Sequence, residues 1–199
     1  LDLYIGTYKL YQKKWLKMLK EYPNILKKEE KEFIKNNFLQ NDAFSWYLNH
    51  IDVDKDYEFN NIKKNYWPFF SHSILIRPKT LNDESIINSN YYNYFSELFD
   101  KLSKRCNFTY NRILRLNLNF SFYNGIKRSN IHVDHPFPHK QILVYLHVDD
   151  LKSYTCIKIN KKFKKIKPTP NKAVVFDSYD HYQITPTKGM RIVLVGTFI

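Results

Sequence analysis

Two histidines and one aspartate in the second half of the chain have the types and the spacing of a metal site. His132 and Asp134 flank a single valine, so in an extended segment both side chains point to the same side and can hold one metal ion together. His181 lies 49 residues after His132, just before a predicted strand, where a jelly roll can bring it back opposite the pair. Two imidazoles and one carboxylate on one face of an octahedron leave the opposite face open for other ligands.

Open positions are what a metal needs when both a co-substrate and O₂ bind to it, and this arrangement is typical of non-haem Fe(II) oxygenases. Arg191 supports that chemistry, because it begins the final apolar strand, where a charge is costly unless it is paired. A dicarboxylate such as 2-oxoglutarate would supply the partner. Its keto-acid end chelates iron, and its far carboxylate accepts two parallel hydrogen bonds from a guanidinium. Without Arg191, a loop histidine and a turn-capping aspartate would explain the His-x-Asp pair equally well.

The elements that must position these residues follow from hydrophobic periodicity. Apolar and polar residues alternate from 114 to 123, which predicts a long half-buried strand that ends at Asn124-Gly125, a turn sequence. Further strands are predicted over 141–148, 155–160, 164–167, 173–176 and 191–199. Short strands at regular intervals, joined by Pro, Asn and Asp turns, indicate a sandwich or jelly roll.

Helices are predicted ahead of the strands. Residues 9–40 show helical spacing in two parts separated at Pro23, and residues 84–105 form another amphipathic pattern. An extended segment is expected between them, from Trp67 to Lys79. Because helices precede the strands instead of alternating with them, we expect an α+β protein with a mainly β core and N-terminal helices packed on one outer face.

The chain is predicted to be a single domain over residues 1–199, with a mainly helical part at 1–105 and a β-helix core that carries the metal site at 106–199.

Disorder is not expected, since 43% of the residues are hydrophobic and can bury ample surface. No apolar run is long enough for a membrane span, and no secretory signal is visible, so we expect a cytoplasmic protein (host cytoplasm if it is phage-encoded) with Cys106 and Cys156 reduced. The acidic stretch 52–58 lacks the central glycine of a calcium loop and is expected to be a solvated loop.

Taken with their flanking residues, these motifs resemble the 2-oxoglutarate- and Fe(II)-dependent oxygenases, in particular the prolyl-4-hydroxylase-like group and its small phage-encoded relatives, over roughly residues 30–199. The resemblance lies in Arg115-Leu116-Asn117-Leu118-Asn119, His132-Val133-Asp134, Pro138-His139-Lys140, Leu143-Val144-Tyr145-Leu146, Tyr154-Thr155, Ala173-Val174-Val175-Phe176-Asp177, His181 and Gly189-Met190-Arg191, and reaches back through Phe33-Ile34 and Phe44-Ser45-Trp46-Tyr47. Arg191 ten positions after His181 is the specific part of the pattern. The resemblance implies a double-stranded β-helix of jelly-roll, cupin-like form.

The resemblance also implies a reaction. His132, Asp134 and His181 would bind Fe(II), and Arg191 would bind the far carboxylate of 2-oxoglutarate. The enzyme would use O₂ to hydroxylate a C–H bond of a protein side chain or nucleobase, with succinate and CO₂ as products and ascorbate as a reductant. An aspartate at the second ligand position favours hydroxylation over halogenation, because it leaves no vacancy for a halide.

Other residues are candidates for the pocket. By resemblance, Tyr123 would contact 2-oxoglutarate, and Thr155 would be the hydroxyl residue on the strand after the first turn, although the usual glycines before it are replaced by Lys152-Ser153-Tyr154. Candidates for contacts to the substrate or around the metal ligands are Arg115, Asn117, Asn119, His135, His139 and Tyr145. Arg115, Asn117 and Asn119 share one strand face, which either lines the pocket or is an ordinary polar outer face.

The charge is uneven along the chain. Residues 1–100 hold 14 Lys and Arg against 14 Asp and Glu, whereas residues 101–199 hold 18 against 5, so that half carries the whole net charge of +13. Such a field favours an anionic ligand, a nucleic acid or an acidic protein, and the lysine-rich hairpin 158–167 either contacts it or is merely solvated. A catalytically silent jelly-roll module that binds such a partner, and a cupin-like metal enzyme that does not use 2-oxoglutarate, are the alternatives.

Overall fold

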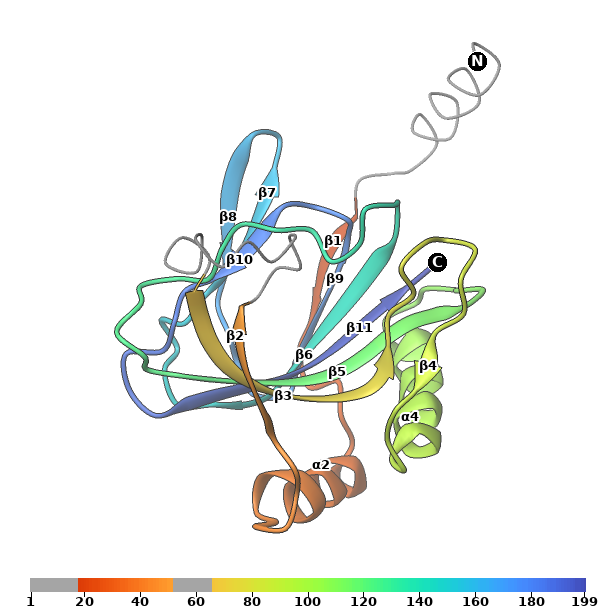
Figure 1. Cartoon of the computed structure of the whole chain (residues 1–199), viewed down its shortest axis with the longest axis horizontal. Coiled ribbons are helices and arrows are strands. Elements are labelled where there is room, and N and C mark those ends of the chain that lie inside the picture. Colours follow the sequence, from red (N-terminus) through yellow and green to blue (C-terminus); the bar gives the residue numbers. More distant parts are fainter. Residues whose placement is uncertain (1–17, 52–65) are drawn as a thin grey trace.

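The computed structural model describes residues 18–51 and 66–199, which form two antiparallel sheets and two helical segments (Figure 1). The large sheet has, in spatial order, β1 (Leu19–Tyr22), β9 (Lys172–Asp177), β6 (Lys140–Val148), β11 (Met190–Phe198), β5 (Ile113–Phe122), β3 (Tyr66–Ile76) and β2 (Tyr47–Ile51), with β4 (Ile86–Ile87) paired to β3. The small sheet has β10 (His181–Gln183), β7 (Thr155–Ile159) and β8 (Lys162–Ile166). This is the double-stranded β-helix, or jelly roll, expected from the sequence.

The helices cover the outer face of the large sheet, as predicted. Helix α2 (Lys28–Ile34) continues into a wider π-helical turn, η1 (Lys35–Leu39), and α4 (Tyr92–Arg105) lies beside the sheet (Figure 1). The apolar residues of α4 recur at helical spacing, so one face of the helix is buried at Phe95, Leu98, Phe99 and Leu102. Arg105 at the end of α4 donates to both carboxylate oxygens of Glu30 in α2, over 2.6 and 2.7 Å, which ties the helices together.

Strand alternation divides the buried residues between two cores. In β6, Ile142 and Val144 join the cluster under the helices, while Leu143 and Tyr145 join the cluster between the two sheets. The neighbouring strand β11 repeats the pattern, because Leu194 faces the helices and its flanking valines face the interior. Every second side chain of these strands therefore points toward the space between the sheets, where the candidate site lies.

One glycine sets the distance between the helices and the sheet. A Cβ atom at Gly196 of β11 would lie 2.6 Å from Cε2 of Phe99 in α4, closer than side-chain carbons approach each other. The absence of a side chain thus lets the Phe99 ring lie directly on the strand.

Two sequence predictions are wrong at particular segments. Residues 19–22, predicted as helix, form strand β1, in which Leu19 pairs with Phe176 of β9 and packs against the inter-sheet cluster. The residues alternate between two faces there, and pairing at a sheet edge overrides their helical spacing. The predicted helix 84–105 begins only at residue 92, since Ile86 and Ile87 pair with the end of β3 and are 62% and 60% exposed.

Within residues 18–51 and 66–105, which the structure describes, the strands β1, β2, β3 and β4 belong to the large sheet beside the helices, where the sequence predicted a mainly helical part. The start of the first predicted helix, at 9–17, and the acidic loop at 52–58 lie outside the described residues. In the part of the chain that the structure describes, no helix is long and apolar enough to cross a membrane.

Candidate functional site

His132 and His181 lie side by side because their backbones pair. The His132 N–H donates to the His181 carbonyl over 3.0 Å, and the His181 N–H donates back to the His132 carbonyl over 2.9 Å. His181 opens β10, and His132 lies in the connection between β5 and β6. The ring centroids are consequently 4.5 Å apart, so the fold brings together the two histidines that the sequence singled out.

A backbone carbonyl two residues earlier orients each imidazole. The Nδ1 atom of His132 lies 3.0 Å from the carbonyl oxygen of Asn130, and that of His181 lies 2.9 Å from the carbonyl oxygen of Tyr179. Because a carbonyl only accepts hydrogen bonds, Nδ1 carries the proton in each neutral ring and Nε2 keeps a free lone pair. Both Nε2 atoms are therefore prepared to bind a metal ion.

Asp134 completes the group with a carboxylate. Its Oδ1 accepts a hydrogen bond from Nη1 of Arg115 over 3.0 Å, while its Oδ2 is buried without a hydrogen-bond partner, 3.7 Å from Nε2 of His181. One ligand atom from each of Asp134, His132 and His181 can be chosen so that all lie within 4.8 Å of one another. A buried carboxylate oxygen without a donor is costly, and a bound cation would remove that cost. These residues fit a metal ion that takes two nitrogens and one oxygen.

The surroundings of the site favour the protonation states in which histidine and aspartate bind a metal ion. Burial, with the neighbouring His132, lowers the pKa of His181 to about 4, so its ring is neutral at pH 7. Burial alone would raise the pKa of Asp134, but electrostatic attraction to His181 and to Arg115 outweighs it and holds that pKa well below its usual range. A neutral imidazole and an ionised carboxylate are the states that coordinate a metal.

Arg191 is a buried cation without a counter-charge among the described residues. It is 2% exposed, and Nη2 donates to Oγ1 of Thr155 over 2.7 Å. The Tyr145 hydroxyl shares the same Thr155 oxygen at 2.8 Å, and the centre of its ring lies 5.1 Å from the guanidinium carbon. Nε and Nη1 of Arg191 have no hydrogen-bond partner. Unpaired donors on a buried cation are what a carboxylate ligand would satisfy.

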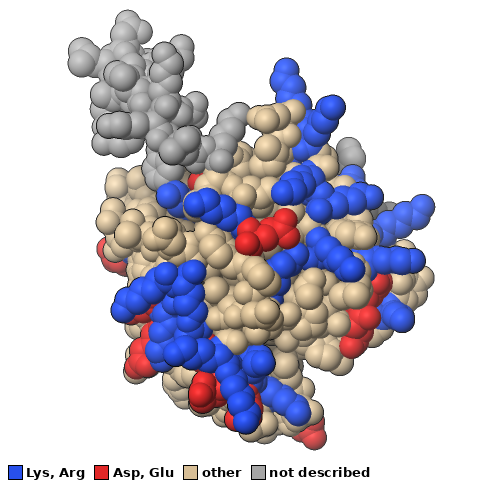
Figure 2. Space-filling model, turned by 180° about the vertical axis from the view of Figure 1, so that it is seen from behind, with Lys and Arg blue, Asp and Glu red and all other residues tan. Residues whose placement is uncertain are grey.

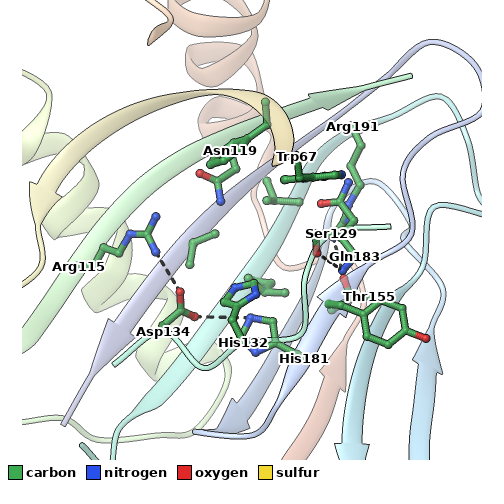
Figure 3. Close-up of a pocket in the computed structure, with 15 residues that line it drawn as sticks. Trp67, Arg115, Asn119, Ser129, His132, Asp134, Thr155, His181, Gln183 and Arg191 are labelled. Carbon is green, nitrogen blue, oxygen red and sulfur yellow. Dashed lines mark hydrogen bonds and ion pairs between the residues drawn. The ribbon is translucent and has the colours of Figure 1, made fainter. Parts of the chain in front are cut away.

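The metal group and Arg191 open into one pocket between the sheets (Figure 3). Of the residues predicted from the sequence, those that line it are Arg115, Asn119, His132, Asp134, Thr155, His181 and Arg191. Residues that sequence reasoning missed include Trp67, Phe69, Ser129, Leu143 and Gln183. Trp67 and Phe69 alternate along β3, whose pairing with β5 brings them beside the predicted strand face, and the Trp67 Nε1–H is held by Oγ1 of Thr185 at 3.0 Å.

Five other sequence candidates are not among the residues that line the pocket, and one of them, Tyr145, lies against Arg191 as described above. Tyr123 follows the end of β5 and is 62% exposed, whereas the resemblance placed it on the co-substrate. Asn117 is buried and accepts a hydrogen bond from Ser73 at 2.7 Å. His135 is held by the Thr197 hydroxyl at 2.8 Å, and burial lowers its pKa to about 3. His139 is also buried, with its ring centroid 4.7 Å from that of His135.

Solved structures share the arrangement of the chain. A 2OG-Fe(II) oxygenase family oxidoreductase from Burkholderia pseudomallei superposes with a TM-score of 0.68 at 10% identity, over 97% of this chain and 89% of that one. The fold is that of the 2-oxoglutarate- and Fe(II)-dependent oxygenases. A Trichoplax adhaerens prolyl hydroxylase, solved with a hypoxia inducible factor peptide, gives 0.53 at 14% identity over 91% and 83% of the two chains. The α-ketoglutarate-dependent epimerase SnoN of nogalamycin biosynthesis gives 0.59 at 8% identity over 98% and 83%.

The sequence itself matches no protein-family model and no curated protein. Since all three structures are less than 15% identical to this chain, they establish its fold, and the chemistry has to be argued from its own residues.

Proposed function

We propose that the protein is an Fe(II)- and 2-oxoglutarate-dependent oxygenase that hydroxylates a C–H bond. The observation that carries the proposal is the pairing of two deficits in one pocket: a metal-ligand group whose carboxylate oxygen Asp134 Oδ2 lacks a donor, and a buried Arg191 that lacks an anion. A dicarboxylate that bridges a metal and a guanidinium satisfies both. The oxygenase fold is consistent with this chemistry.

His132, Asp134 and His181 would hold the iron, and Arg191 would hold the far carboxylate of 2-oxoglutarate. When bound, iron and 2-oxoglutarate supply a coupled oxidation, in which O₂ converts 2-oxoglutarate to succinate and CO₂ and leaves one oxygen atom on the substrate. Arg115 orients the carboxylate of Asp134, and Thr155 fixes the guanidinium of Arg191. Trp67 and Phe69, which line the pocket, would keep water out of it. Tyr145 supports Arg191 from behind, through its ring and its hydroxyl on Thr155.

A peptide is the substrate class that the fold comparison favours, because one oxygenase of the same fold is a prolyl hydroxylase solved with a peptide. The solved structures described here give no support to a nucleic-acid substrate. They do include an epimerase, so the product has to be identified as well as the turnover. A hydroxylated product gains one oxygen atom, whereas an epimer keeps the mass of the substrate.

The decisive experiment is anaerobic titration of the protein with Fe(II) and then 2-oxoglutarate, followed by exposure to O₂. We expect a weak visible charge-transfer band that needs both additions and disappears in Arg191→Ala, and succinate when O₂ enters. Metal binding that 2-oxoglutarate does not alter would instead identify a metal enzyme that does not use it. If the protein neither bound metal nor formed succinate with any peptide tested, the proposal would be overturned. A binding module would then be the remaining interpretation. Ascorbate is added in a parallel arm, where it should prolong turnover without being consumed in proportion to product.

A further inference from the structure

The small sheet has an outer face that the proposed chemistry does not use. Strand alternation along β10 places the side chain of Tyr182 on the face opposite His181 and Gln183, although Tyr182 is also one of the residues that border the pocket. Register extends that face across the sheet, because Tyr182 pairs with Cys156 of β7, which in turn pairs with Lys165 of β8. Tyr182, Cys156 and Lys165 therefore share one face of the small sheet, on which the Cys156 side chain itself is fully buried.

Aromatic rings and cations alternate on this outer face. The guanidinium carbon of Arg128 lies 4.9 Å from the centre of the Tyr182 ring. The Phe163 ring stands edge-on to Tyr182, with centroids 5.0 Å apart, and the Nζ atom of Lys165 lies 5.8 Å from the centre of the Tyr154 ring. Phe163 is 36% exposed although it is apolar, with a lysine on either side of it in the strand. The supported ring of Phe163 is thus open to a flat partner.

The charge around these rings is strongly positive. The segment 158–167 holds six lysines and no acidic residue. Among the described residues, Lys158 pairs with Asp180 at 2.8 Å and Lys164 with Glu21 at 3.7 Å, while Lys161, Lys162 and Lys167 form no ion pair. In Figure 2, blue side chains surround the region where the β7–β8 hairpin projects and red ones are few. The surface attracts a polyanion from one side of the molecule.

We propose that this outer face of the small sheet, defined by Arg128, Tyr154, Phe163, Lys165 and Tyr182, binds single-stranded nucleic acid. A single strand offers phosphates to the cations and unstacked bases to the rings, and sheet faces that combine both groups bind it in this way. An acidic polypeptide would satisfy the lysines but would leave the exposed Phe163 ring without a role. Apart from Tyr182, which also borders the pocket, the residues of this face lie outside the pocket lining, so the binding can be tested separately from the proposed oxygenase reaction.

The test is fluorescence anisotropy with labelled twelve-nucleotide oligo-dT and oligo-U, on the full chain. Contact with about four phosphates predicts that affinity falls roughly 50-fold between 50 and 200 mM salt, with a slope of about 0.7 per phosphate on logarithmic scales. The double variant Lys161→Glu, Lys165→Glu should weaken binding at least tenfold. Phe163→Leu should weaken it roughly fivefold or more at every salt concentration and leave the salt slope unchanged, because it removes stacking and keeps the charge.

Matched controls separate this site from general basicity. The double variant Lys101→Glu, Lys104→Glu makes the same charge change on α4, on the far side of the large sheet. Its affinity for the oligonucleotides should stay within twofold of the wild-type affinity. His132→Ala should leave it unchanged. Poly-glutamate is the competing ligand. The proposal is overturned if the wild type does not bind at 50 mM salt, if the α4 variant loses as much as the hairpin variant, or if poly-glutamate binds equally well and Phe163→Leu has no effect.

Discussion

His132 and His181 exchange both of their backbone hydrogen bonds, so the two candidate metal ligands that are most distant in the sequence belong to one rigid pair. His181 also pairs with Ile157 of β7, so this isolated bridge is attached to the small sheet through β10. A metal ion bound to both rings would therefore crosslink two neighbouring segments that are already paired, and it would pin Asp134 to them.

Metal binding should raise the thermal stability of the protein. At a Mn²⁺ concentration one hundred times the dissociation constant, binding to the folded state alone contributes about 2.7 kcal/mol, which is roughly 5–10 °C in Tm for a chain of this size. Differential scanning calorimetry with and without Mn²⁺ measures the change, and chelation should reverse it. Asp134→Ala should abolish the rise, while His147→Ala, which alters a half-exposed histidine outside the pocket, should retain it.

Arg115 should act on the metal through Asp134. Its hydrogen bond to Oδ1 directs the other oxygen, Oδ2, toward the histidines. Arg115→Gln should weaken metal affinity about 10- to 100-fold with the fold intact, and Arg115→Lys should recover part of it. Calorimetric titration with Mn²⁺ at constant pH gives the affinity. An Arg115→Gln protein that binds Mn²⁺ as tightly as the wild type would show that the ion pair is only structural.

Thr155 should be needed to fix the Arg191 guanidinium. Thr155→Val removes the acceptor of a 2.7 Å hydrogen bond without removing the charge, so 2-oxoglutarate affinity should fall by about fivefold to tenfold. Thr155→Ser keeps the oxygen and should bind nearly as well as the wild type. Titration of the metal-loaded protein with 2-oxoglutarate compares the three. Equal affinities would exclude Thr155 from the co-substrate site.

The Glu30–Arg105 pair should make stability depend on pH. Burial disfavours ionisation of Glu30, but the hydrogen bonds from Arg105 and the Lys27 N–H outweigh it and hold its pKa below the usual value. A carboxyl with a lowered folded pKa stabilises the protein above its unfolded pKa, and that contribution is lost as pH falls through the folded value. Glu30→Gln should cost about 1.5 kcal/mol at pH 7.

Urea denaturation at pH 7 and near pH 3 measures this contribution. The difference in unfolding free energy between Glu30→Gln and the wild type should shrink at the lower pH. The matched control is Glu32→Gln, because Glu32 forms only an exposed ion pair with Lys28 at 3.9 Å and should change stability by less than about 0.5 kcal/mol. A Glu30→Gln deficit that stays constant with pH would contradict the electrostatic explanation.

Gly196→Ala should destabilise the contact between α4 and the sheet. The new methyl group would lie 2.6 Å from the Phe99 ring, so the helix or the ring has to shift, at a cost of about 1–3 kcal/mol. The second substitution Phe99→Leu should restore part of the loss, because the shorter side chain leaves space. Urea denaturation of the two single variants and the double variant forms the cycle that tests this coupling.

The sequence alone was sufficient to find site residues that occupy alternating positions of one extended segment. His132, Asp134, His181 and Arg191 lie around one pocket, although His132 forms an isolated bridge and Asp134 lies in a bend, so the connection between β5 and β6 places these first two residues. Arg115 and Asn119 were found for the same reason, on the alternating strand that became β5. The helices on one outer face were likewise predictable from their periodicity.

The remainder depends on pairing between distant segments. Trp67 enters the pocket because β3 lies beside β5, a neighbourhood that no local pattern encodes. Tyr145 lies in β6, whose apolar residues are buried on both faces, so period alone could not say which side of the strand it occupies. Leu19 forms an edge strand because β9 is there to pair with it, although its neighbours have helical spacing.

Because side chains of β6 and β11 alternate between two cores, the residues that shape the pocket are different from the residues that support the helices. Leu143, Val193 and Val195 line the pocket, while Ile142 and Leu194 on the same strands pack under the helices. A library randomised at the first three positions would alter the shape of the pocket and leave the helix layer with its original residues. The scaffold is in that sense suited to acquiring new substrates by substitution at pocket positions alone.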